Sequence, residues 1–139
     1  MTTTAPTPDS VRAAVAAVPG RIVAAWAAQD ADAFAAVFTE EGTIILPGAI
    51  GIGREAVREF AARGFAGPYR GTRVTGTPIA LQLLGPDAAV VTTRGGVLHG
   101  DETEVAPERA IHATWVVVLR DGEWQLAAYQ NSPANPVAA

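Results

Sequence analysis

The stretch AIHATWVVVLRDGEWQLAAYQN, residues 110–131, carries the strongest fold signal in this chain. Two runs rich in β-branched and aromatic residues, 110–120 and 123–131, flank the dipeptide Asp121-Gly122. Asp-Gly between two such runs is typical of a two-residue β-hairpin turn, because both turn positions need a positive φ angle. The stretch therefore predicts an antiparallel hairpin at the end of the chain.

The turn also predicts how the two strands pair. In a regular hairpin, Leu119 lies opposite Trp124, and Val117 lies opposite Leu126. Because side chains alternate along a strand, each face then has its own character. One face is bulky and apolar and consists of Trp115, Val117, Leu119, Trp124 and Leu126. The other face ends in four polar residues, which are His112, Thr114, Tyr129 and Asn131.

These four polar residues have two interpretations. Polar groups that converge at one end of a hairpin face are typical of a ligand pocket, where they orient the bound molecule. The same pattern is typical of a solvated face, or of a cluster that satisfies its own hydrogen bonds. A shift of one residue in the pairing would exchange the faces, so the face that lines a pocket stays open at this stage.

The rest of the chain predicts three helices followed by strands. The first helix begins at Asp9 or Ser10 and runs to Trp26, and Pro19 kinks or splits it. Asp30 opens a short second helix that ends near Gly42. A third helix is expected at 53–65, a short buried strand at 43–46, and long strands at 70–84 and 88–99. Helices segregated before antiparallel strands favour the α+β class.

Composition limits the functions that fit. The 139 residues suit one domain over 1–139, with loose tails at about 1–8 and 133–139. Hydrophobic residues make up 49% and charged residues only 17%, which favours an apolar cavity or a self-association face. The net charge of −4 argues against nucleic acid and anionic membranes as partners. The sequence lacks a membrane-spanning apolar run and a signal-peptide pattern, so we expect a cytoplasmic protein.

Several segments resemble a known superfamily. They are AAWAAQDADAFAAVFTEEGTIILPG (24–48), GREAVREF (53–60) and RDGEWQLAAYQNSP (120–133). Together they resemble the nuclear transport factor 2-like superfamily, whose SnoaL-like members include polyketide cyclases and ketosteroid isomerases. The segments GPYRGTRVTGTP (67–78) and WQLAAYQNSP (124–133) look most like the SgcJ/EcaC family, which has members in enediyne antibiotic biosynthesis.

The resemblance implies a cone, in which a strongly curved antiparallel sheet wraps over three N-terminal helices. A pocket opens at the wide end, and the outer face of the sheet forms a homodimer. His112, Thr114, Tyr129 and Asn131 would then face the pocket, and the Trp115 face would pack outward. The apolar ligand-binding wall implied by the resemblance consists of Trp26, Phe34, Phe38, Leu46, Phe60 and Tyr69.

The resemblance does not extend to the isomerase chemistry. That reaction needs a general base and a tyrosine donor, and the matching positions here are Leu46 and Ile22. Neither side chain can transfer a proton. His112 is the remaining acid/base candidate, since histidine titrates near neutral pH. Two histidines without a carboxylate at ligand spacing make a poor metal site, so we expect neither a metal nor a cofactor.

Three functions remain open. The first is a pocket protein of enediyne polyketide biosynthesis that acts on an apolar polyketide or polyene intermediate, with His112 as acid/base in a cyclase-like or isomerase-like step. The second is a non-catalytic binding or sequestration protein, or an accessory factor of a partner synthase. The third is a dimerisation module without ligand chemistry.

Overall fold

The structure is a computed structural model that describes residues 7–135, so the predicted tails lie largely outside the described residues. Its helices are α1 (Pro8–Ala27), α2 (Ala31–Ala36) and α3 (Arg54–Ala66), with a short 3-10 helix, η1, at Pro107–Arg109. Its strands are β1 (Phe38–Leu46), β2 (Ala49–Ile52), β3 (Arg73–Gly85), β4 (Ala88–Leu98), β5 (Ile111–Arg120) and β6 (Glu123–Pro133). The predicted α+β class is confirmed.

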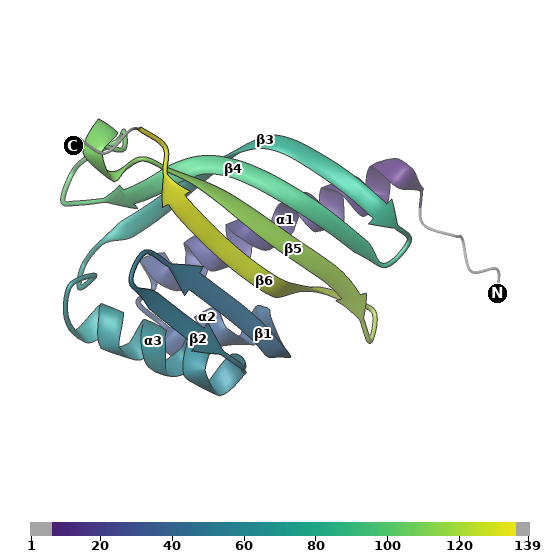
Figure 1. The fold of residues 1–139 in the computed structure, drawn as a ribbon, viewed down its shortest axis with the longest axis horizontal. Coiled ribbons are helices and arrows are strands. Elements are labelled where there is room, and N and C mark those ends of the chain that lie inside the picture. The colour runs from purple at the N-terminus through teal and green to yellow at the C-terminus, as the bar shows by residue number, and fades with distance from the viewer. Residues whose placement is uncertain (1–6, 136–139) are drawn as a thin grey trace.

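The six strands form one curved sheet in the order β2-β1-β6-β5-β4-β3. All neighbouring pairs are antiparallel except β1 and β6, which run parallel. Strands β3–β6 cross over α1, while β1 and β2 lie beside α2 and α3 (Figure 1). The helices therefore fill the concave side of the sheet, as the resemblance implied.

The first helix begins earlier in the sequence than predicted. Thr7 caps α1, because its hydroxyl oxygen accepts a hydrogen bond from the Ser10 amide at 3.1 Å. Pro8 then occupies the first turn, where a missing amide proton costs nothing. Pro19 is buried inside the same continuous helix, which excludes the alternative that it splits the helix.

The second helix is shorter than predicted, since α2 ends at Ala36 and β1 begins at Phe38. Glu40 and Glu41 are therefore exposed strand residues and do not end a helix. Pairing with β6 overrides the local helical pattern, because the Leu126 amide donates to the Val37 carbonyl at 2.8 Å. The segment between β1 and α3 contains a further strand, β2, which was not predicted from the sequence and which pairs with the end of β1.

The last hairpin follows the predicted pairing only for its first half. The Asp-Gly turn and the pairs Leu119–Trp124 and Val117–Leu126 are as predicted. A β-bulge then places one extra residue in β6, and Trp115 pairs with Tyr129. The bulge turns Tyr129 and Asn131 of β6 to the face of Trp115. This face is buried, so the prediction that the Trp115 face packs outward is wrong. Bulges increase the local twist of a strand, which suits a sheet that must curl around a core.

The hydrophobic core lies between the helices and the concave face of the sheet. From β5 and β6 it receives Trp115, Val117, Trp124 and Leu126, each at most 9% exposed. From the helices it receives chiefly Val15, Val18, Ile22, Trp26, Phe34, Val57 and Phe65. The apolar face of the hairpin thus packs onto the helices, and the opposite face of the sheet points away from them.

Candidate functional site

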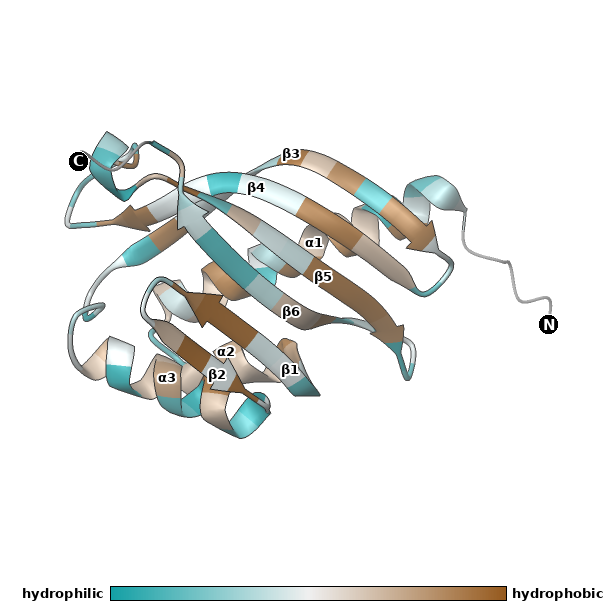
Figure 2. Cartoon of the chain, in the orientation of Figure 1, coloured by the Kyte–Doolittle hydropathy of each residue, from teal (hydrophilic) through white to brown (hydrophobic). Residues whose placement is uncertain are grey.

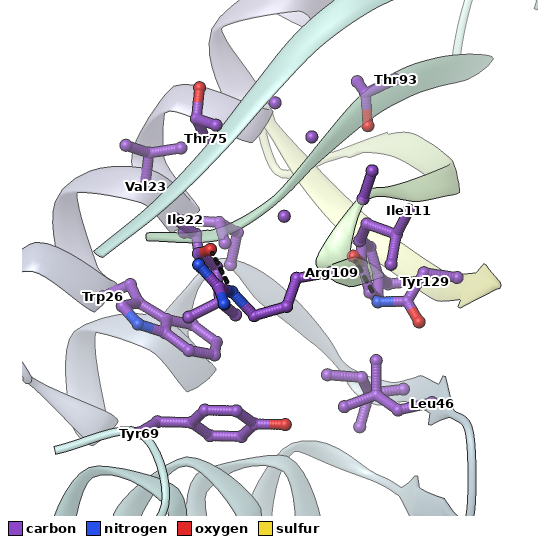
Figure 3. A pocket seen from close by; sticks show the side chains of 18 of the residues that line it. Ile22, Val23, Trp26, Leu46, Tyr69, Thr75, Thr93, Arg109, Ile111 and Tyr129 are labelled. Atoms are coloured by element: carbon purple, nitrogen blue, oxygen red, sulfur yellow. Dashed lines mark hydrogen bonds between the residues drawn. The ribbon is translucent and has the colours of Figure 1, made fainter. Parts of the chain in front are cut away.

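A cavity of about 400 Å³ opens on the concave side of the sheet, between the helices and strands β3–β6. Figure 3 shows its walls, with α1 and the loop after α3 on one side and β6 and η1 on the other. Eight residues predicted to bind ligand line it, which are Trp26, Phe34, Phe38, Leu46, Phe60, Tyr69, Tyr129 and Asn131. The structure thus brings them together, and their role in ligand binding stays a prediction.

Aromatic rings form one wall of the cavity, centred on Trp26. The centroid of its ring lies 5.0 Å from that of Tyr69, 5.3 Å from Phe65 and 6.1 Å from Phe34. The indole nitrogen of Trp26 donates a buried hydrogen bond to the Thr72 hydroxyl at 2.9 Å. Since that polar atom is satisfied, the ring presents an apolar surface to the cavity.

The loop that carries Tyr69 is tied to α1. The side-chain oxygen of Gln29 accepts from the Gly71 amide at 3.0 Å, and its side-chain nitrogen donates to the Thr72 carbonyl at 3.2 Å. The Tyr69 ring packs so closely on α3 that a Cβ at Gly64 would lie 2.7 Å from its edge. The loop therefore holds the Tyr69 ring in one place.

Tyr129 and Asn131 form the main polar feature of the opposite wall. The Asn131 amide nitrogen donates to the Tyr129 hydroxyl oxygen at 2.9 Å. The Tyr129 ring packs edge-on against Trp115, with centroids 4.7 Å apart. Burial raises the pKa of the Tyr129 phenol above its ordinary value, and the hydrogen bond from Asn131 opposes this shift only in part. The phenol is therefore a neutral donor at physiological pH.

The loop between β4 and β5 forms part of the rim of the cavity. The Glu102 carboxylate accepts from the His99 amide at 2.7 Å and from the Arg109 guanidinium at 2.5 Å. Both hydrogen bonds lower the pKa of the Glu102 carboxyl, and the bond from the His99 amide has the larger effect. Arg109 also lines the cavity, which was not predicted from the sequence. The only sequence feature that could have indicated it is a basic residue within an acidic loop.

His112 and Thr114 do not reach the cavity, so the prediction that they face it is wrong. Both lie on the outer face of β5, because they alternate with the buried Ala113 and Trp115, and they pair with Ser132 and Gln130 of β6. His112 is exposed, and its Nε2 lies 3.4 Å from an Arg94 guanidinium nitrogen on the neighbouring strand. A role for His112 as acid/base in the cavity is therefore not supported by its position.

The two positions that match the isomerase base and tyrosine both lie on the cavity wall. Leu46 comes from the end of β1 and Ile22 from the middle of α1 (Figure 3). Both are apolar, so the cavity lacks proton-transfer groups at these two places. Among residues 7–135, no group of three His, Cys, Asp or Glu side chains is arranged to hold a metal ion.

The fold and this pocket define the chain as a cone-shaped α+β protein with an internal cavity. Residues 15–136 match the SnoaL-like domain, and the chain belongs to this family. No match was found among curated proteins. No helix in the described part, residues 7–135, is long and apolar enough to cross a membrane.

Solved structures share the fold at low sequence identity. A cystatin-like protein of unknown function from Nostoc punctiforme is 24% identical, with a TM-score of 0.80 over 97% of this chain and 82% of that one. A nuclear transport factor 2-like protein from Novosphingobium aromaticivorans is 18% identical, with a TM-score of 0.77 over 91% and 84%. A ketosteroid isomerase-like protein from Erwinia carotovora is 21% identical, with a TM-score of 0.70 over 90% and 97%. These likenesses establish the fold alone.

Proposed function

We propose that this protein binds a small, largely apolar molecule in its cavity without transforming it by acid/base chemistry. The observation that carries the proposal is the 400 Å³ cavity, which has aromatic and aliphatic walls and a few polar groups. Sites of this kind take up drug-sized organic ligands, and their polar groups orient the ligand. The apolar residues at the two isomerase positions, Ile22 and Leu46, favour binding over catalysis.

The resemblance to the SgcJ/EcaC family suggests the class of ligand. We propose an apolar polyketide or polyene intermediate of enediyne biosynthesis, which the protein would sequester or present to a partner synthase. A conjugated chain of this kind is apolar along its length and matches the aromatic wall around Trp26.

Binding can be tested with diphenylhexatriene, a neutral polyene whose fluorescence rises in apolar surroundings. We expect Leu46→Trp to fill the cavity and weaken binding by roughly tenfold or more, since the indole occupies the space of the ligand. The matched control is Leu84→Trp, because Leu84 is 56% exposed on β3 and does not line the cavity. Equal binding by the two variants would contradict the proposal.

The absence of catalysis has its own test. A linear conjugated polyene incubated with the protein should be recovered with unchanged mass, absorbance and chromatographic retention. A new product would contradict the proposal of simple binding. His112→Ala should change neither the binding nor the recovery, because His112 lies outside the cavity.

We also propose that the outer face of the sheet forms a homodimer. Ile45 and Ile50 are paired on β1 and β2 and are 43% and 66% exposed. Val116 extends the same outer face into β5, between Val90 and Ala128. The ribbon is coloured hydrophobic at the end of β1, over β2 and over much of β5 (Figure 2). A group of exposed apolar residues such as Ile45 and Ile50 is typical of an association surface.

Sedimentation equilibrium tests the dimer. We expect the wild-type protein to be a dimer and Val116→Arg to be a monomer, because an unpaired charge would be buried at the interface. The matched control is Ala24→Arg, at an exposed position on α1 away from the sheet. A wild-type monomer, or a dimer that persists in Val116→Arg, would contradict this interface.

A further inference from the structure

We propose that the cavity selects a neutral ligand with a hydrogen-bond acceptor oxygen, and that the hydroxyls of Tyr129 and Tyr69 recognise this oxygen. The inference rests on the proposed function, since it specifies the chemistry of the molecule that the cavity binds. Tyr129 and Tyr69 come from opposite walls and are the only two tyrosines in the chain.

The first observation is the hydrogen bonding of Tyr129. Its hydroxyl oxygen accepts from the Asn131 amide nitrogen, so the hydroxyl has an acceptor bond but no donor bond among residues 7–135. A phenol can donate one hydrogen bond as well as accept. The Trp115 ring covers one side of Tyr129, and the cavity lies on another. The unused proton is therefore available to a ligand in the cavity.

The second observation is the position of Tyr69. Its hydroxyl makes no hydrogen bond within residues 7–135, and it points across the cavity toward the side of Leu46 (Figure 3). The ring is held by Trp26, and Gln29 holds the loop that carries it. A donor fixed in place before binding loses little conformational freedom when the ligand arrives.

The third observation concerns charge. Burial raises the pKa of Tyr129, and the nearby Tyr69 adds to this shift, so Tyr129 remains a neutral donor. The Arg109 guanidinium at the rim is paired with the Glu102 carboxylate, with that of Glu108 4.0 Å away. An anionic ligand would meet these carboxylates, and the one arginine among the lining residues is already paired with them. A ketone or another neutral carbonyl compound fits the two phenols better.

The test compares fluorene with fluorenone, which have the same ring system and differ by one ketone oxygen. Their affinities are measured by quenching of tryptophan fluorescence, since Trp26 and Trp115 line the cavity. We expect Tyr129→Phe to lower the ratio of fluorenone to fluorene affinity by roughly tenfold, the size of one hydrogen bond. Tyr69→Phe should lower the same ratio, and neither variant should weaken fluorene binding.

Asn131→Asp provides a second, nearly isosteric variant. An ionised carboxylate can only accept, so it would take the proton of Tyr129 that the ligand needs. The affinity ratio should again fall, while His112→Ala on the outer face should leave it unchanged. A ratio that is the same in wild type, Tyr129→Phe and Tyr69→Phe would overturn the inference and leave the proposed function standing.

The remaining outcomes are also decisive. Tighter binding of fluorene-9-carboxylate than of fluorenone would overturn the assignment of a neutral ligand. Binding of none of these compounds, together with no binding of diphenylhexatriene, would overturn the proposed function itself. Binding of diphenylhexatriene and fluorene with an unchanged ketone ratio in the variants would reject only the role of the tyrosines.

Discussion

Gly95→Ala is expected to lower the free energy of unfolding by about 3 kcal/mol or more, at the upper end of overpacking effects. Gly95 pairs with Gly76 where β3 passes very close to β4. A Cβ at Gly95 would lie 1.9 Å from the Thr75 carbonyl oxygen and 2.8 Å from the Gly76 Cα. Both contacts are with backbone atoms, so a side-chain rotation cannot relieve them. Urea unfolding followed by tryptophan fluorescence measures the change.

Gly20→Ala is the matched control. Gly20 lies inside α1, and apart from its chain neighbours and the backbone of its own helix no atom lies within 4 Å of where a Cβ would stand. Alanine is favoured over glycine in a helix by up to about 1 kcal/mol, so this variant should be slightly more stable than wild type. Wild-type stability of Gly95→Ala would contradict the close approach of β3 and β4. Because Gly76, Gly95 and Gly96 all line the cavity, that approach also shapes the binding site.

Phe38→Ala is expected to lower the free energy of unfolding by about 3–5 kcal/mol, the range for truncating a buried aromatic side chain. Phe38 is 1% exposed at the start of β1, and its ring centroid lies 5.7 Å from that of Phe34. Domains of this kind are stable by only about 5–15 kcal/mol, so the loss is a large part of the total. The same ring lines the cavity, so the variant should also bind the polyene probe differently.

Chemical denaturation again provides the measurement, with Leu84→Ala as the control. Leu84 is 56% exposed on β3, away from Ile45 and Ile50, so its truncation should change the free energy of unfolding by no more than about 0.5 kcal/mol. An equal effect of the two truncations would show that Phe38 is not part of the core. The denaturant dependence should be unchanged in both variants if only stability is altered.

The sequence predicted those parts of the fold that depend on neighbouring residues. The Asp-Gly turn formed as expected, with φ angles of 52° at Asp121 and 76° at Gly122. Asp30 caps α2, because its carboxylate accepts from the Ala33 amide at 3.0 Å. The irregularities of the β3–β4 pair lie at Pro78–Ala80 and Leu83–Gly85, whereas Gly95 and Gly96 are regularly paired. In this protein those glycines permit a close approach of two strands.

The candidate site was predicted only in part. The resemblance placed the aromatic residues around Trp26 on a pocket wall, and they line the cavity. Tyr129 and Asn131 also face the cavity. The strand pairing from which this was predicted differs from the observed pairing by one residue in this part of the hairpin. Arg109 was missed, because its contact with Glu102 depends on how the loop between β4 and β5 folds over the rim.

The sequence by itself determined the helices, the long strands and the hairpin turn, because caps, hydrophobic periodicity and turn residues act over a few positions. Only the tertiary structure decided which side chains of the hairpin meet the ligand. An extra residue in β6, between Leu126 and Ala128, turns Tyr129 and Asn131 to the face of Trp115, and no local signal marks it. The bulge suits the curvature of the sheet, which must close over the helices. Burial of the Trp115 face against the helices leaves His112 outside the cavity, and the bulge places Tyr129 inside it.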